Sequence, residues 1–283
     1  MPELPEVETI RRQLDVLLPG RSFTAIETRW AKSLTGRGRP VGDVLARPVT
    51  RVWRRGKVLG LDFDGGVTLL VHLRMTGQLV LGPGDRPPPD VTGTRVVLHL
   101  DDRSRLHFND QRKFGRMVVV PTSESAADPL LARMGPEPLD PGFDPEVLRA
   151  ILRRHPGLRL KSVLLDQGSI AGIGNIYADE ALWQAGLHPE RRSGAVRRPG
   201  VEALHHGIVT VLSEGVARGG STMRDYVDSR GDRGGYLEVA AVYGRTGQPC
   251  RRCGTPIVKS VVVGRGTHLC PSCQVAPRRR RTG

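Results

Sequence analysis

Apolar residues near the start of the chain recur with helical spacing. After Pro5 they fall three or four residues apart, at Val7, Ile10, Leu14, Leu17 and Leu18. Glu6 and Glu8 lie in the first turn of this pattern, and Pro19-Gly20 follows its last residue. Acidic side chains and a proline both favour the first turn of a helix, and a Pro-Gly pair ends one. We therefore predict a helix from about residue 5 to residue 18.

Between about residues 22 and 120 the pattern changes to short apolar runs separated by turn residues. The clearest runs cover residues 58–63, 67–73, 95–100, 105–108 and 117–120. Asp64-Gly65-Gly66 separates the first two runs, and polar residues 101–104 separate the next two. Such pairs of runs are typical of β-hairpins. This part of the chain is therefore predicted to form an antiparallel β-sandwich or a flattened barrel.

The second half of the chain is predicted to be mainly helical. Asp144-Pro145 suits a helix start, and apolar residues then recur to Leu152. Further helical stretches cover residues 158–167, 176–185 and 201–216, and the polar, glycine-rich residues 221–235 are predicted to form a mobile loop.

The predicted organisation is an α+β protein in four parts. A β-sandwich covers residues 1–125, and a proline-rich linker covers 126–143. A helical domain with the flexible loop covers residues 144–235, and residues 236–283 hold a β-hairpin and a basic tail.

The charge balance indicates the class of partner. The chain has 283 residues with 43 Lys and Arg against 29 Asp and Glu, a net charge of +14. Such an excess of positive charge is typical of a protein that binds a polyanion, and nucleic acid is favoured over an anionic membrane surface. No apolar run approaches the ~20 residues of a membrane span, and the first residues do not resemble a signal peptide. We expect a soluble, cytoplasmic and nucleoid-associated protein with no membrane partner.

All four cysteines lie close together near the end of the chain. Cys250 and Cys253 form one CxxC pair, and Cys270 and Cys273 form a second pair after sixteen intervening residues. This spacing is typical of a tetrahedral zinc site on a β-hairpin. Because four thiolates leave no open coordination position, one structural Zn²⁺ is predicted.

The first residues also offer catalytic chemistry. Removal of Met1 would leave Pro2 with a free secondary amine, a group whose pKa is near ~8, followed at once by Glu3. Such an amine can attack an electrophilic sugar carbon and give an iminium, and Glu3 can move protons. The alternative is that Pro2 occurs by chance and that Pro5 simply starts a helix.

Several other residues are candidates for contact with DNA. Gly172 to Asn175 precede a helix and suit a phosphate, although Asn175 can equally be an ordinary N-cap. Arg265, on the predicted hairpin tip, is either a phosphate ligand or a surface arginine. His72 is either DNA-facing or simply solvated. Three residues suit insertion into a base stack, with burial in the core as the alternative: Met75, Arg112 and Phe114.

Several motifs occur together in one order along the chain. They are MPELPEVE, RRGK, HLRMTG, QRKFG, LKSVLLDQ, GIGNIYADE, GGSTMRDY and CPSCQ. In this combination the chain resembles the formamidopyrimidine-DNA glycosylase family over about residues 2–273. The resemblance implies an N-terminal β-sandwich, a helix-two-turn-helix domain with a β-hairpin zinc finger, and binding of damaged double-stranded DNA by a monomer.

The resemblance also implies an activity and residue roles. The family removes 8-oxoguanine and ring-opened purines and then cleaves the strand by β,δ-elimination. Pro2 is the implied nucleophile, and Glu3 is the implied acid and base. Lys57 is implied to be a catalytic residue and also to bind a phosphate, as Asn175 and Arg265 do. Met75, Arg112 and Phe114 are the implied inserted residues, Glu6 and Lys161 lie near the opened sugar and the damaged base, and the loop over that base comprises Ser221, Thr222, Met223, Arg224, Asp225 and Tyr226.

Two alternative functions remain open. A relative of endonuclease VIII would act on oxidised pyrimidines, although Phe114 in the RKFG motif favours the purine branch. A non-catalytic zinc-finger protein would bind damaged DNA tightly but would form no covalent adduct with it.

Overall fold

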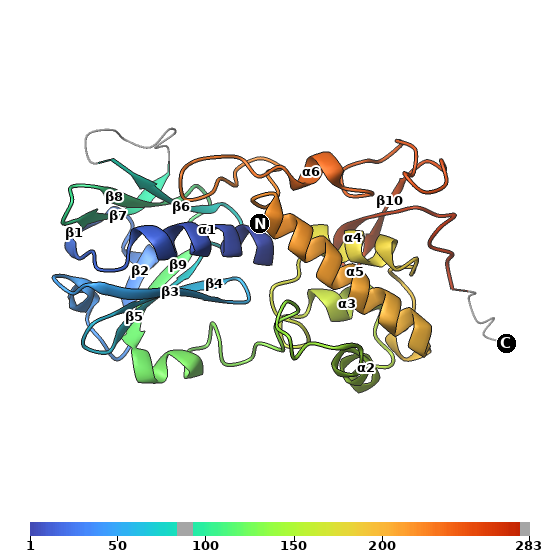
Figure 1. Cartoon of the computed structure of the whole chain (residues 1–283), viewed down its shortest axis with the longest axis horizontal. Helices are drawn as coiled ribbons and strands as arrows, with labels where there is room; N and C mark the ends of the chain where they lie inside the picture. The colour runs from blue at the N-terminus through green and yellow to red at the C-terminus, as the bar shows by residue number, and fades with distance from the viewer. Residues whose placement is uncertain (84–92, 278–283) are drawn as a thin grey trace. The chain divides into compact units, whose positions relative to one another are not determined.

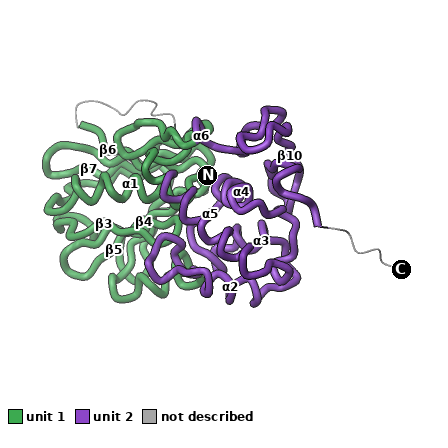
Figure 2. The backbone as a smooth tube through the Cα atoms, turned by 45° about the vertical axis from the view of Figure 1, so that its right-hand side comes forward, with its two compact units in different colours: residues 1–133, 215–236 green, residues 134–214, 237–283 purple. Residues whose placement is uncertain are grey.

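The chain forms two compact units in the computed structural model, which describes residues 1–83 and 93–277. Unit 1 combines residues 1–133 with residues 215–236, and unit 2 combines residues 134–214 with the residues from 237 onward (Figure 2). A segment from the second half of the chain is therefore part of the unit that contains the N-terminus.

Unit 1 is a β-sandwich of two sheets (Figure 1). The five-stranded sheet has the order β2 (Leu34–Gly36), β9 (Arg116–Pro121), β5 (Val67–His72), β4 (Val58–Phe63) and β3 (Val49–Arg55). The four-stranded sheet has the order β1 (Phe23–Thr28), β7 (Thr94–Leu100), β8 (Arg105–Asp110) and β6 (Gly77–Gly82). The predicted sandwich is confirmed, with one difference. The short edge strand β2 pairs in parallel with β9, while the other strand pairs are antiparallel.

The N-terminal helix α1 (Leu4–Leu17) packs into the core of this sandwich. Val7, Ile10 and Leu14 are at most 1% exposed and contact core residues from the strands. Leu17, which the periodicity also placed on the apolar face, is 39% exposed. Tyr226 belongs to the same core cluster, which explains why residues 215–236 group with unit 1.

Unit 2 contains the remaining helices and the C-terminal hairpin. Its elements are α2 (Pro145–Arg154), α3 (Leu160–Leu165), α4 (Asn175–Gln184), most of α5 (Arg198–Ala217), α6 (Tyr236–Val239) at its border, β10 (Val258–Val262) and β11 (Arg265–Leu269). Short 3-10 helices cover Ala31–Ser33, Val41–Val44, Thr122–Ala127 and Ser193–Ala195. The predicted start of α2 is confirmed, since the Asp144 side chain accepts the Val147 N–H at 2.8 Å.

The two units differ from the four predicted segments in two respects. The loop at residues 221–235 groups with the sandwich rather than with the helices, and the hairpin groups with the helices of unit 2. Both differences come from contacts between residues far apart in the sequence, which local patterns do not report. Among residues 1–83 and 93–277, none of the helices combines the length with the apolar run that crossing a membrane requires.

The two faces of α1 should respond very differently to truncation. Leu14→Ala should lower the free energy of unfolding by about 2–5 kcal/mol, because Leu14 is fully buried and its removal leaves a cavity. Val16→Ala, on the opposite face and 82% exposed, should change it by less than about 0.5 kcal/mol. Urea unfolding followed by circular dichroism measures both, and equal midpoints for the two variants would contradict the packing described here.

Candidate functional site

The start of α1 is held by a reciprocal capping box. Glu3 is the N-cap residue, and its backbone N–H donates to Oε2 of Glu6 at 2.7 Å. The Glu3 side chain in turn accepts the backbone N–H of the third helical residue, Glu6. Pro2 is buried, and Glu3 and Glu6 are 2% and 1% exposed. Glu3, the predicted acid and base, and Glu6, expected near the opened sugar, therefore share one ordered turn beside Pro2.

Glu6 also binds the first residue of the predicted loop, Ser221. Its Oε1 accepts the backbone N–H of Ser221 at 2.6 Å and the Ser221 hydroxyl at 2.8 Å. The Tyr226 hydroxyl donates to the carbonyl of Glu6 at 3.2 Å. Gly220 lies between these contacts with φ +85°, and a Cβ there would lie 2.9 Å from Glu6 Cγ. A glycine is needed at position 220 because its positive φ is strained for other residues and because a Cβ would collide with the Glu6 side chain.

Hydrogen bonds hold the two ends of this loop, and its tip is exposed. Thr222 donates its hydroxyl to the Tyr226 carbonyl at 2.9 Å and accepts the Gly234 N–H at 2.8 Å. The carbonyl of Asp225 accepts the Gln78 side chain. Met223 is 54% exposed, and Arg224 is also exposed. An exposed methionine beside an arginine suits contact with a base and a phosphate.

Lys57 and His72 lie at neighbouring ends of paired strands. Lys57 follows the turn between β3 and β4 and is 4% exposed, and Val58 beside it pairs with His72 on β5. Burial, with the positive charges of Arg74 and Lys57, lowers the pKa of His72 to about 3. The Nδ1 of His72 accepts the backbone N–H of Arg74 at 3.0 Å. At neutral pH His72 is a half-buried neutral ring rather than a solvated cation.

Two exposed loops carry the residues predicted to enter the base stack. Met75 is 40% exposed and Phe114 is 47% exposed, so the alternative that they are core residues is wrong. The Arg112 guanidinium lies 4.9 Å from the centre of the Phe114 ring. Asp110 holds the loops side by side, because it accepts the Thr76 hydroxyl at 2.5 Å and the N–H of Gly115 at 2.6 Å. Sequence reasoning missed Asp110 and Thr76, which give no periodic signal.

In unit 2, Asn175 and Arg265 lie close together. Gly174 is the N-cap of α4, so the alternative that Asn175 is the N-cap is wrong. The Asn175 Nδ2 donates to the carbonyl of Gly266 at 2.9 Å, and its buried Oδ1 has no hydrogen-bond partner among the described residues. Arg265, next to Gly266, begins β11 and is exposed. The helix start and the hairpin tip thus present adjacent polar groups.

Lys161 lies in a network of buried hydrogen bonds. Its side chain is fully buried, and its Nζ donates to Asp179 at 2.5 Å, to the Thr267 hydroxyl at 2.8 Å and to the carbonyl of Gly266 at 3.2 Å. These three hydrogen bonds tie the ammonium to α4 and to the start of β11. The side chain fastens the hairpin to α3 and α4, and the expected place of Lys161 near the damaged base stays a prediction.

Two consecutive acidic residues of α4 organise the rest of unit 2. Asp179 accepts the backbone N–H of His268 at 2.8 Å in addition to binding Lys161. Glu180 accepts three backbone N–H groups, from Ala241, Val242 and Tyr243, at 2.7–2.9 Å. Burial raises the pKa of Glu180, and these hydrogen bonds oppose the rise. Sequence reasoning missed both residues, although adjacent acids in an otherwise apolar helix were a usable signal.

The four cysteines converge on one point, as predicted. Their sulfur atoms all lie within 4.8 Å of one another, and three of the Sγ–Sγ distances are 3.4–3.9 Å. A tetrahedron with Zn–S bonds of about 2.3 Å requires sulfur separations of about 3.8 Å. The Trp183 indole donates to the Cys250 sulfur at 3.4 Å. The residues present fit one zinc ion with four thiolate ligands, and no ligand position remains for water.

The Lys161–Asp179 pair gives a sharp stability prediction. Lys161→Met leaves Asp179 buried without its cation and should cost about 3–5 kcal/mol. Lys161→Met with Asp179→Leu should recover only part of this loss, because the His268 N–H then loses its acceptor. Arg198→Met removes an exposed partner of Glu202 and should cost less than about 1 kcal/mol. Urea unfolding measures all three variants, and a Lys161→Met protein as stable as Arg198→Met would refute the buried pair.

Family models match three parts of the chain. Residues 1–117 match the formamidopyrimidine-DNA glycosylase N-terminal domain, and residues 134–227 match the H2TH domain of the same enzyme. Residues 247–275 match the zinc finger found in FPG and IleRS. These matches cover most of the sandwich, helices α2 to α5 and the cysteine hairpin.

Similar proteins match nearly the whole chain. Formamidopyrimidine-DNA glycosylases of Desulforamulus reducens and Herpetosiphon aurantiacus are both 44% identical, covering 98% and 97% of this chain and 100% of theirs. The crystal structure of MutM (Fpg) from Thermus thermophilus is 41% identical with a TM-score of 0.87, covering 98% of this chain and 100% of that one. A complex of Lactococcus lactis Fpg with abasic-site DNA is 34% identical with a TM-score of 0.88, covering 97% and 100%. The chain therefore belongs to the formamidopyrimidine-DNA glycosylase family.

Proposed function

We propose that this protein is a bifunctional DNA glycosylase and abasic-site lyase that removes oxidised purines, 8-oxoguanine and formamidopyrimidines, from double-stranded DNA. The observation that carries the proposal is the buried capping box that orders Pro2, Glu3 and Glu6 at one helix start. The similar Lactococcus lactis structures hold DNA with a Fapy-dG or an abasic site, which supports this substrate class.

Base removal needs a nucleophile and a proton donor. Once Met1 is removed, the secondary amine of Pro2 attacks C1′ of the damaged nucleotide. The bond from C1′ to the base nitrogen breaks, and the base leaves with a proton. The amine loses its own proton, the sugar ring opens, and an iminium forms between Pro2 and C1′. Glu3, one residue away, is placed to accept and return protons.

The iminium then makes strand cleavage possible. It withdraws electrons from C2′, so a C2′ proton is lost and the C3′–O bond breaks with departure of the 3′-phosphate. In a second elimination, a C4′ proton is lost and the C5′–O bond breaks, which releases the 5′-phosphate. Water finally hydrolyses the iminium and frees Pro2. These steps need only the amine, proton transfers and water, and the zinc ion supplies structure rather than chemistry.

The remaining predicted residues suit binding of the duplex. Lys57, Asn175 and Arg265 are proposed to bind phosphates. The neutral ring of His72 is proposed to donate a hydrogen bond to the DNA beside the phosphate that Lys57 binds. Met75, Arg112 and Phe114 are proposed to fill the space left by an extruded nucleotide. The segment from Ser221 to Tyr226 is proposed to cover the extruded base. We also propose that the protein acts as a monomer in the cytoplasm, at the nucleoid, where its DNA substrate lies.

Borohydride trapping tests the proposed chemistry directly. A duplex with 8-oxoguanine opposite cytosine should become covalently linked to the protein under borohydride, and mass spectrometry should place the sugar on the nitrogen of Pro2. A variant with alanine inserted before Pro2 should give no adduct at that proline. A linkage to a lysine would overturn the proposal, and a stronger reaction with a thymine glycol duplex would favour the pyrimidine specificity of endonuclease VIII.

The salt dependence of binding tests the role of Arg265. Loss of one phosphate contact should reduce the slope of log K against log salt concentration by about 0.9 in Arg265→Ala. Arg252→Ala is the matched control, since Arg252 is also an exposed arginine of the metal-binding region but donates to the carbonyl oxygens of Trp183 and Gln184. Fluorescence anisotropy at several salt concentrations gives both slopes. An unchanged slope for Arg265→Ala would exclude the phosphate contact.

A further inference from the structure

Glu8 is a buried carboxylate that the proposed reaction does not use. It lies on α1 five residues after the N-cap Glu3 and is 9% exposed. Its oxygens accept hydrogen bonds from Arg11 at 3.0 and 3.1 Å, from Arg12 at 2.8 Å and from Arg54 at 3.1 Å. Burial would raise the pKa of Glu8, but these arginines outweigh it and lower the pKa. Glu8 is therefore ionised at neutral pH.

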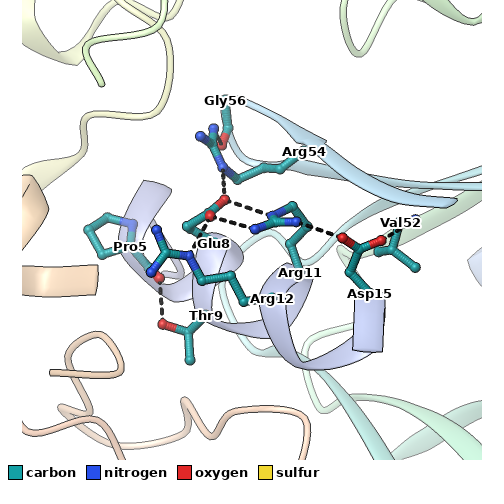
Figure 3. A network of polar contacts seen from close by, with 9 residues as sticks. All are labelled: Pro5, Glu8, Thr9, Arg11, Arg12, Asp15, Val52, Arg54 and Gly56. Carbon is teal, nitrogen blue, oxygen red and sulfur yellow. Dashed lines mark hydrogen bonds and ion pairs between the residues drawn. The ribbon is translucent and has the colours of Figure 1, made fainter. Parts of the chain in front are cut away.

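Arg54 connects this carboxylate to another part of the proposed site. It lies near the end of β3, and its side chain is 10% exposed. Its Nε donates to Oε2 of Glu8, and its Nη1 donates to the carbonyl of Gly56 at 3.1 Å. Figure 3 shows the guanidinium between these two acceptors. Gly56 has a φ of +54° in the turn between β3 and β4, directly before Lys57.

A second contact fixes α1 along the same strand. Asp15 accepts the backbone N–H of Val52 at 3.0 Å through Oδ1 and binds Arg11 through Oδ2 at 3.0 Å (Figure 3). Asp15 lies two turns after Glu8, so α1 is held to β3 at two points about 10 Å apart along its axis. Two separated contacts restrict both sliding and rotation of the helix on the strand.

We propose that Glu8 and Arg54 are positioning residues for the reaction, because they fix the turn that carries Lys57 relative to the helix start that carries Pro2 and Glu3. This inference rests on the proposed function. A buried ion pair adds little net stability in comparison with apolar packing, so its effect is expected mainly in geometry. A misplacement of about 1 Å between reacting groups can cost about 100-fold in rate.

Arg12 provides a matched control on the same carboxylate. It donates to Glu8 at 2.8 Å, but its side chain is 60% exposed, and among the described residues Glu8 is its single polar partner. Arg12→Met therefore removes one positive charge and one hydrogen bond to Glu8 without cutting the connection to β3. Arg54→Met removes the same charge and cuts that connection.

The experiment uses the full-length zinc-loaded protein and a duplex with one abasic site, so that base recognition plays no part. Single-turnover cleavage and borohydride trapping give the rate constant, and a duplex with an uncleavable tetrahydrofuran site gives the Kd. Arg54→Met should lower the rate constant about 30- to 100-fold, while Arg12→Met should lower it less than about threefold. The Kd values of the two variants should agree within about threefold, because both have lost one charge.

Two further variants separate positioning from general damage to the fold. Arg54→Lys keeps the charge beside Glu8, but a single ammonium cannot form the same fork to Glu8 and Gly56, so at least about a tenfold rate loss is expected. Adding Lys57→Met to Arg54→Met should cost little beyond Lys57→Met alone, because the two residues act in one unit. Arg54→Lys decides the question if Arg54→Met does not fold.

The outcomes distinguish the two proposals. If the unmodified protein forms no adduct with abasic DNA, the proposed function fails. If that protein forms the adduct and Arg54→Met and Arg54→Lys both match Arg12→Met in rate, the positioning inference is overturned while the proposed function stands. Fully additive rate losses for Arg54→Met and Lys57→Met would overturn the inference as well.

Discussion

A single buried carboxylate, that of Glu6, holds together the parts of unit 1 on which the proposed chemistry depends. It accepts the backbone N–H of Glu3, the backbone N–H of Ser221 and the Ser221 hydroxyl while only 1% exposed. A buried carboxylate is costly unless donors surround it, and here three donors do. Because Glu6 and Ser221 are 215 positions apart in the sequence, the helix start and the distant loop become one structural element.

Unit 2 uses the same physical device on α4. Asp179 binds the ammonium of Lys161 and a backbone N–H of β11, and Glu180 binds three successive N–H groups of the segment before the cysteines. In each unit, buried acids satisfy donors from segments that are remote in sequence. The metal site then fixes the far end of the hairpin, so Arg265 is presented from a structure fastened on both sides.

Local patterns in the sequence predicted much of this structure. The helix after Pro5, the hairpin around Gly65 and the thiolate site depend on spacing within a few residues, and all three are present. The grouping of residues 215–236 with the sandwich and the burial of Lys161 depend on contacts across the sequence, which periodicity does not record.

Hydrogen exchange of the Glu6→Gln variant tests this account most directly. A glutamine has nearly the same shape, but its amide presents a donor where the carboxylate accepts, so it cannot satisfy Glu3 and Ser221 together. We predict faster amide exchange in peptides covering residues 1–8 and 219–226 at the same time, with no change in Glu27→Gln, whose side chain is exposed. Faster exchange in only one of these segments, or in neither, would contradict the central role of the Glu6 carboxylate.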